Sequence, residues 1–138
     1  MTMLVVDCSV TMAWCFEGET TPFTEASLDA VAKHSAVVPA FWVLEVANVL
    51  AMSLRRKVLT DSKVDKFRGL LARLHVRLEP HEQERTRGPV LDLAKMHGLT
   101  SYDAAYLEVA KRLTLPLASL DKALRVAAKA AGVELFEG

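Results

Sequence analysis

Residues 3–9 read Met-Leu-Val-Val-Asp-Cys-Ser, a short Val-rich run that ends in an acidic residue. A run of this kind, bounded by a polar residue, predicts a strand that is buried on both faces. It also places Asp7 at the carboxyl end of that strand. Outward from this stretch, short apolar runs alternate with helical segments. Strands that alternate with helices predict an α/β domain with a mostly parallel sheet covered on both faces.

The remaining elements follow from apolar periodicity and from the positions of Gly and Pro. The further strands are expected at residues 36–38, 75–78, 116–118 and 133–136. The helices are expected at residues 10–16, 22–34, 40–57, 61–73, 83–97, 101–113 and 121–131. Gly98 is expected to end the fifth of these helices. The length of 138 residues suits one domain, and we treat residues 1–138 as a single unit.

Composition and charge narrow the functional classes. Cys8 and Cys15 are too few for a disulfide framework and predict free thiols in a reducing compartment. No secretory signal or apolar stretch of roughly 18 residues is evident, so we expect a cytoplasmic protein. Residues 1–50 carry a net charge of −5 and the remainder +5. This split suits an acidic pocket bordered by a basic surface that holds a polyanion, although solvated amphipathic helices give the same pattern.

Four carboxylates interrupt apolar segments of the chain, namely Asp7, Glu45, Asp103 and Asp121. An acidic group in or beside a core is costly unless it is paired or binds a cation. The carboxyl ends of parallel strands meet at one edge of a sheet, where sites in such folds form. Carboxylates gathered there repel one another, and Mg²⁺ or Mn²⁺ removes that conflict. The four acids together therefore predict a site for a divalent cation.

Each acid except Glu45 also has a simple structural explanation. Asp7 can cap the helix that follows it, and Ser9 can either cap that helix or add an oxygen near a metal. Asp103 lies in the first turn of its helix, where the helix dipole favours negative charge. Asp121 starts a helix, and Ser119 two residues earlier can orient a carboxylate or a water.

Glu45 is harder to explain as a cap. Its helix is apolar almost all round from Ala40 to Met52, apart from Glu45 and Asn48, which share a face. Such a helix is expected to be buried. A hydrogen-bonded pair within the helix or a buried salt bridge with an arginine are the alternatives, but no cation lies one turn away.

The order of these residues resembles the PIN-domain family, specifically its VapC-type toxins. The resemblance covers essentially the whole chain. It rests on Val-Val-Asp7-Cys-Ser, on Pro39 followed by Glu45 and Asn48, on Ser-Tyr-Asp103-Ala-Ala-Tyr-Leu, and on Leu-Ala-Ser119-Leu-Asp121-Lys-Ala-Leu. It implies a three-layer α/β/α sandwich with a mostly parallel sheet of four or five strands.

The resemblance also implies an activity and a set of roles. It implies a Mg²⁺- or Mn²⁺-dependent endoribonuclease, the toxin of a toxin–antitoxin pair, which hydrolyses RNA with a metal-activated water. Asp7 and Asp103 are the metal ligands that it implies, Glu45 completes the site and Asp121 supports a metal or orients the water. The supporting residues are Ser9, Asn48 and Ser119.

The implied partners are an RNA substrate, a cognate antitoxin protein and a second copy of the chain. Basic residues are then candidates for positioning the RNA backbone, namely Arg55, Arg56, Lys57 and Arg85. The alternatives are a catalytically weak PIN module that only binds RNA or a partner, and a structural domain whose acids are caps. A phosphatase-like hydrolase with Asp7 as nucleophile requires a second acid two residues later, where this chain has Ser9.

Overall fold

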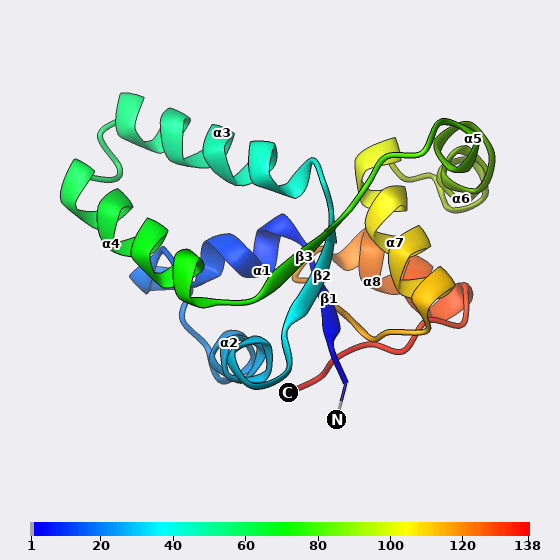
Figure 1. Ribbon diagram of the computed structural model, residues 1–138, viewed down its shortest axis with the longest axis horizontal. Coiled ribbons are helices and arrows are strands. Elements are labelled where there is room, and N and C mark those ends of the chain that lie inside the picture. Colours follow the sequence, from blue (N-terminus) through cyan, green and yellow to red (C-terminus); the bar gives the residue numbers. More distant parts are fainter. Residues whose placement is uncertain (1) are drawn as a thin grey trace.

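The computed structural model describes residues 2–138. Its centre is a parallel sheet of four strands in the order β3-β2-β1-β4 (Figure 1). The strands are β1 (Leu4–Val6), β2 (Ala36–Pro39), β3 (Val76–Glu79) and β4 (Leu117–Ala118). The fifth strand expected at residues 133–136 is reduced to one bridge, in which Leu135 pairs with Leu117. Because β4 is only two residues long, it offers little length for a further strand to pair with.

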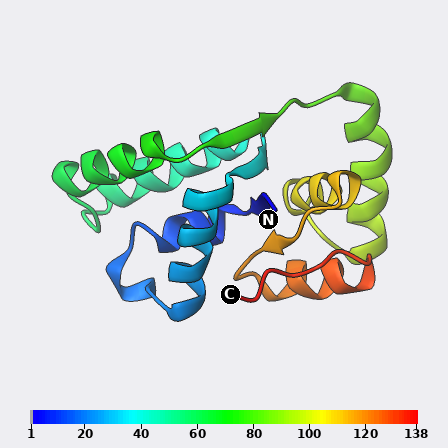
Figure 2. The same ribbon diagram turned by 60° about the horizontal axis from the view of Figure 1, so that its bottom comes forward.

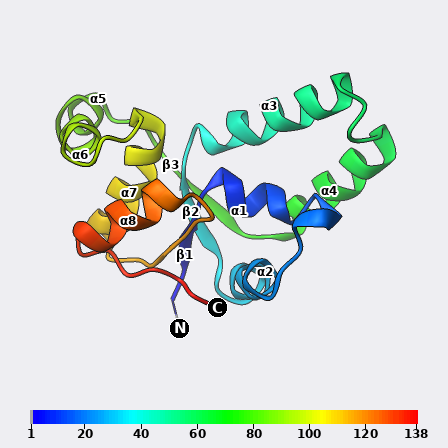
Figure 3. The same ribbon diagram turned by 180° about the vertical axis from the view of Figure 1, so that it is seen from behind.

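Helices cover both faces of this sheet. They are α1 (Cys8–Ala13), α2 (Pro22–His34), α3 (Trp42–Arg55), α4 (Asp61–Arg73), α5 (Gln83–Arg85), α6 (Leu91–His97), α7 (Ser101–Leu113) and α8 (Lys122–Ala130), with a 3₁₀ turn η1 (Glu17–Glu19). α1 and α2 lie on one side of the sheet, and α7 and α8 on the other (Figures 1 and 3). The expected three-layer α/β/α sandwich is therefore confirmed. None of the helices in residues 2–138 is long and apolar enough to cross a bilayer.

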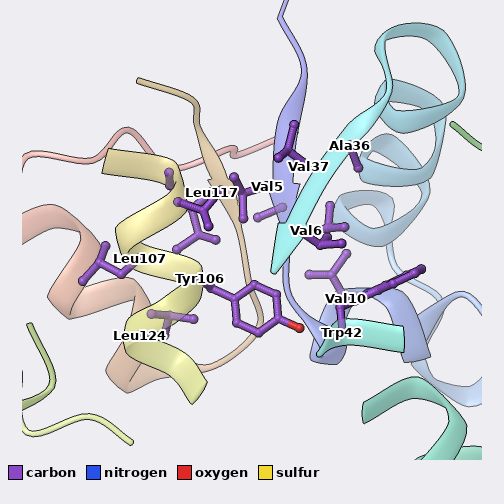
Figure 4. Packing of buried hydrophobic residues seen from close by; sticks show 14 of the residues in the cluster. Val5, Val6, Val10, Ala36, Val37, Trp42, Tyr106, Leu107, Leu117 and Leu124 are labelled. Carbon is purple, nitrogen blue, oxygen red and sulfur yellow. The ribbon is translucent and has the colours of Figure 1, made fainter. Parts of the chain in front are cut away.

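The core lies where the strands meet α1 and α7. Val5 and Val6 of β1 and Val37 of β2 have no exposed surface, as expected for a short Val-rich strand covered on both faces. Figure 4 shows the ring of Tyr106 reaching from α7 across this core toward the start of α3, with its hydroxyl at the tip. This side chain is 1% exposed, so its polar end needs a partner inside the protein.

Residues 83–97 form one continuous rod, as expected, but the rod is not a single α-helix (Figure 2). Its middle, η2 (Thr86–Val90), is wound as a π-helix and contains Pro89. Proline lacks an N–H and its ring clashes with the carbonyl four residues earlier, so a wider turn accommodates it. Gly98 ends α6 in the left-handed conformation, with φ at 64°, which confirms the expected stop.

α3 departs most from expectation. It runs beside α4 in a helical hairpin that projects from the sheet (Figures 1 and 2). It buries Trp42, Val46 and Leu50, but Val43 is 49% exposed and Leu44 73% exposed. The prediction that this apolar helix is buried all round was wrong, because the chain itself covers only one of its faces.

Candidate active site

The fold brings the four carboxylates of the sequence to one edge of the sheet. Asp7 directly follows β1, Asp121 follows β4, Glu45 lies on the helix after β2, and Asp103 lies in the first turn of α7. β1 and β4 are neighbours although the chain visits β2 and β3 between them, so the site lies at a switch in strand order. The negative charges of Asp7 and Asp121 act on Asp103, and those of Asp103 and Asp7 act on Glu45.

Asp7 is the best-anchored member of this group. Its Oδ1 accepts hydrogen bonds from the Ser9 hydroxyl (2.6 Å) and the Val10 N–H (3.1 Å), and its Oδ2 accepts one from the Ser119 hydroxyl (2.5 Å). The pairing of Val6 with Ala118 explains the last contact, because Asp7 and Ser119 come next on adjacent parallel strands. Asp7 is thus the helix cap that the structural alternative required, and it is also part of the acidic cluster.

The environment of Asp7 makes its negative charge costly. The side chain is 4% exposed, and this burial raises the pKa of its carboxyl above the ordinary value. The hydrogen bonds from Ser119, Ser9 and Val10 oppose that rise, whereas the charge of Asp121 adds to it.

Two serine hydroxyls join the ends of β1 and β4 into one network. The Ser119 hydroxyl, which donates to Asp7, also accepts from the Asp121 N–H at 3.0 Å. The Ser9 hydroxyl accepts from the Leu120 N–H at 3.0 Å. The carboxylate of Asp121 in turn accepts from the Leu124 N–H and caps α8. Ser9 and Ser119 therefore position the Asp7 carboxylate and the backbone at Leu120 and Asp121, whereas Asp7 is the residue that caps the first helix.

Glu45 is held by a residue that the sequence pattern did not assign a role. The Tyr106 hydroxyl donates to Glu45 Oε1 at 2.5 Å, across the gap between α7 and α3. Burial raises the pKa of Glu45; the bond from Tyr106 lowers it, and the charges of Asp103 and Asp7 raise it. The available signal for Tyr106 was its position three residues after Asp103, which puts both on one side of α7. Its partner, 61 residues away, could not be inferred from that spacing.

Asp103 is the least anchored of the acids with raised pKa values. Its N–H is capped by the Thr100 hydroxyl at 3.1 Å, but within residues 2–138 its carboxylate accepts no hydrogen bond. Partial burial and the charges of Asp121 and Asp7 raise its pKa. An anionic group with no donor and two acidic neighbours is suited to a cation.

Carboxylate oxygens are ligands that suit a hard divalent metal, although these side chains do not yet surround one point. Among residues 2–138, no three His, Cys, Asp or Glu side chains lie close enough together to hold an ion as they stand. The carboxylates are nevertheless desolvated and repel one another, which is the condition that Mg²⁺ or Mn²⁺ relieves. Burial and the nearby Glu45 and Asp7 raise the pKa of Cys8 to about 12, so its thiol stays protonated.

The other candidates lie farther from this cluster or are already paired. Asn48 is exposed on α3 and forms no hydrogen bond with Glu45 in the described residues. Arg55 lies ten residues beyond Glu45, about 15 Å along the same helix. Arg85 pairs with Glu82 at 3.0 Å and lies 4.0 Å from Glu108.

Comparison with known proteins agrees with the fold. The PIN domain family model matches residues 4–130. Ribonuclease VapC3 from Pyrobaculum aerophilum is 30% identical over 122 residues, which are 88% of this chain and 91% of that protein. The crystal structure of PAE2754 from the same organism has a TM-score of 0.64 at 21% identity, covering 91% of this chain and 84% of that one. The crystal structure of FitAcB from Neisseria gonorrhoeae has a TM-score of 0.57 at 21% identity, covering 97% and 96%.

Proposed function

Because the chain belongs to the PIN-domain family of VapC-type toxin ribonucleases, we propose that it is itself a metal-dependent endoribonuclease and the toxin of a toxin–antitoxin pair. The observation that carries the proposal is the gathering of Asp7, Glu45, Asp103 and Asp121 at one sheet edge, where none of them pairs with a basic side chain of residues 2–138. Residues 1–138 then act as one nuclease domain.

Asp7 and Asp103 are the residues that we propose hold the cation, Mg²⁺ or Mn²⁺. A bound ion of this type supplies an activated water and positive charge for the hydrolysis of an RNA phosphodiester bond. Ser9 and Ser119 orient Asp7 and favour its ionised form through the bonds that they donate to it. Tyr106 does the same for Glu45, and the Asp121 carboxylate is fixed by its cap.

The proposed protein partners follow from the family and from an uncovered surface. We propose that the chain forms a homodimer and is neutralised by a cognate antitoxin. The exposed Val43 and Leu44 on α3 support contact with a second chain, since large apolar side chains that cluster at a surface are typical of protein interfaces.

The test is cleavage of an RNA pool by the purified protein. EDTA should stop cleavage, and added Mn²⁺ or Mg²⁺ should restore it. Asp103→Asn should lose at least about 100-fold in rate, the scale on which one electrostatic group in an active site acts. Glu25→Gln, an exposed acid on α2, is the matched control and should cleave like the parent. Cleavage that survives EDTA would overturn the proposed metal dependence.

The alternative of a catalytically weak binding module gives a different result. In that case the parent and Asp103→Asn bind RNA equally well, and neither leaves cut ends. The presence of all four acids favours the nuclease over this alternative.

A further inference from the structure

A pocket opens beside the helix that carries Asp103, and nothing in the proposed chemistry uses it. Its volume is about 270 Å³. Its wall comes from the ends of β2 and β3, the start of α3 and one side of α7, through Pro39, Phe41, His81, Tyr102 and Val109. These residues are far apart in sequence, so no local pattern shows the pocket.

The wall is an aromatic cluster around Phe41. His81 stacks on Phe41 with ring centroids 5.3 Å apart and an interplanar angle of 14°. Its Nε2 also accepts the Phe41 N–H at 3.0 Å, which fixes the imidazole ring. Tyr102 meets Phe41 edge-on at 5.4 Å and is 62% exposed. A large aromatic side chain therefore stands in solvent beside a preformed apolar wall.

The polar side of the pocket contains Arg85 and Arg112 together with Glu82 and Glu108, and these two glutamates pair with the arginines. Arg112 donates through Nε to Glu108 at 2.8 Å and pairs with Glu79 at 3.0 Å. Arg85 pairs with Glu82 at 3.0 Å. A guanidinium carries five N–H donors, so both arginines retain donors for the acceptor atoms on the edge of a base.

The pocket and the carboxylates occupy neighbouring sides of α7. Tyr102 faces the pocket, whereas the next residue, Asp103, belongs to the acidic cluster. Phe41 also contacts Tyr106 edge-on at 5.5 Å, and Tyr106 donates to Glu45. A ligand that enters the pocket is thus separated from the acidic cluster by one layer of aromatic rings.

We propose that this pocket binds one unpaired nucleobase of the RNA, in a nucleotide close to the bond that is cut. The inference rests on the proposed ribonuclease function and adds to it a subsite for the substrate. Bases stack on aromatic side chains and on arginine planes, and both line this pocket. Its volume of about 270 Å³ is just below the roughly 300–1,000 Å³ of small-molecule sites, which suits a single base. The competing occupant is a side chain of a protein partner.

Binding is tested with short single-stranded RNAs that carry the fluorescent base 2-aminopurine at one position at a time, on an Asp103→Asn background that does not cleave. At one position the fluorescence should be quenched on binding. Tyr102→Ala should remove the quenching and weaken binding about tenfold, which corresponds to about 1.4 kcal/mol of stacking. Tyr102→Phe should keep both. The control Val126→Ala, an exposed apolar residue on α8, should change neither.

A cleavage assay with Asp103 intact distinguishes two ways in which Tyr102→Ala can act. The variant can lose a contact with the base, or it can displace the neighbouring Asp103. An abasic nucleotide at the quenched position should slow the parent about tenfold and should abolish the difference between the parent and Tyr102→Ala. If Tyr102→Ala is equally impaired on the abasic RNA, or if no position is quenched, the subsite is wrong. The subsite is also wrong if Tyr102→Ala weakens binding of the antitoxin and leaves binding of RNA unchanged. Because quenching does not require cleavage, failure of the ribonuclease proposal is seen separately.

Discussion

The two sides of the acidic cluster are built differently. On one side, Asp7 and Asp121 follow adjacent strands and are fixed by two serine hydroxyls and by backbone N–H groups. On the other side, Glu45 and Asp103 stand on helices, one with a single donor and the other with none in the described residues. Half of the site is therefore preorganised by the sheet, and the other half remains free to adjust.

This difference has a physical reason. A buried carboxylate such as Asp7 is tolerated only if hydrogen bonds compensate for its lost hydration. The half-buried Glu45 and Asp103 are still partly hydrated, so they need fewer fixed donors. We infer that the sheet side sets the position of the site and that the helix side responds to what binds there.

The largest effects are expected from Asp7→Asn and Asp103→Asn, which should both reduce cleavage at least about 100-fold. Their effects on the metal-free fold should differ. Asp103→Asn relieves repulsion and breaks no hydrogen bond within residues 2–138, so it should raise the melting temperature. Asp7→Asn places an NH₂ donor where a carboxylate oxygen accepted a hydrogen bond. Its melting temperature should therefore rise by less than that of Asp103→Asn, or fall. Equal shifts of the melting temperature would remove the distinction between the two sides.

Ser119→Ala should come next in size. It removes one donor to Asp7 and the acceptor of the Asp121 N–H, and the side chain has no exposed surface through which water could replace it. A buried group left without a partner costs about 1–3 kcal/mol. Ser9→Ala is the matched variant, because Ser9 also donates to Asp7 but is only half-buried. Urea unfolding should give the larger loss for Ser119→Ala, and a larger loss for Ser9→Ala would contradict this account.

A smaller effect is expected from Tyr106→Phe. The variant keeps the buried ring and loses only the bond to Glu45, for which about 0.5–1.5 kcal/mol of stability is typical. Because Glu45 loses the one donor that it has among residues 2–138, kcat/KM should fall by about tenfold or less, equivalent to at most about 1.4 kcal/mol. Tyr102→Phe is the control, since no hydrogen bond of its hydroxyl occurs in residues 2–138. Unchanged kcat/KM in Tyr106→Phe would show that the bond does not position Glu45.

The sequence predicted the sheet side of the site better than the helix side. A Val-rich run that ends in Asp7, and a second strand followed by Ser119 and Asp121, are local patterns, and the parallel sheet makes them neighbours. The bounds of α2, α4 and α7 also match the expected helices, because threonine caps mark where they begin.

The contacts that the sequence did not predict connect distant segments. The bond from Tyr106 to Glu45 and the stacking of His81 on Phe41 each join residues at least 40 positions apart. The exposure of Leu44 was missed for a related reason. Apolar periodicity identifies which residues avoid water, but it does not tell whether the same chain or another one covers them.

The smallest effect is the contribution of Asp103, on the helix side, to the dependence of stability on pH. The pKa of Asp103 is raised in the folded protein above its ordinary value of 3.8. Between these two values the folded state binds more protons than the unfolded state, so the free energy of unfolding falls as pH rises.

Asp103→Asn lacks this titration. Without metal, the melting temperatures of the parent and Asp103→Asn should therefore be similar below about pH 3.8, and the parent should fall behind as pH rises through the raised pKa. The difference between the two proteins cancels the titration of groups that Asp103 does not influence, which is why it is the quantity to measure. Glu45 adds to the difference with the same sign, because the charge of Asp103 raises its pKa as well. Saturating Mn²⁺ should reverse the order at neutral pH, because an ion held at 100 times its Kd stabilises the parent by about 2.7 kcal/mol. A difference in melting temperature that stays constant with pH would mean that the pKa of Asp103 is not raised in the folded protein. The contrast between the two sides of the cluster would then lose its electrostatic basis.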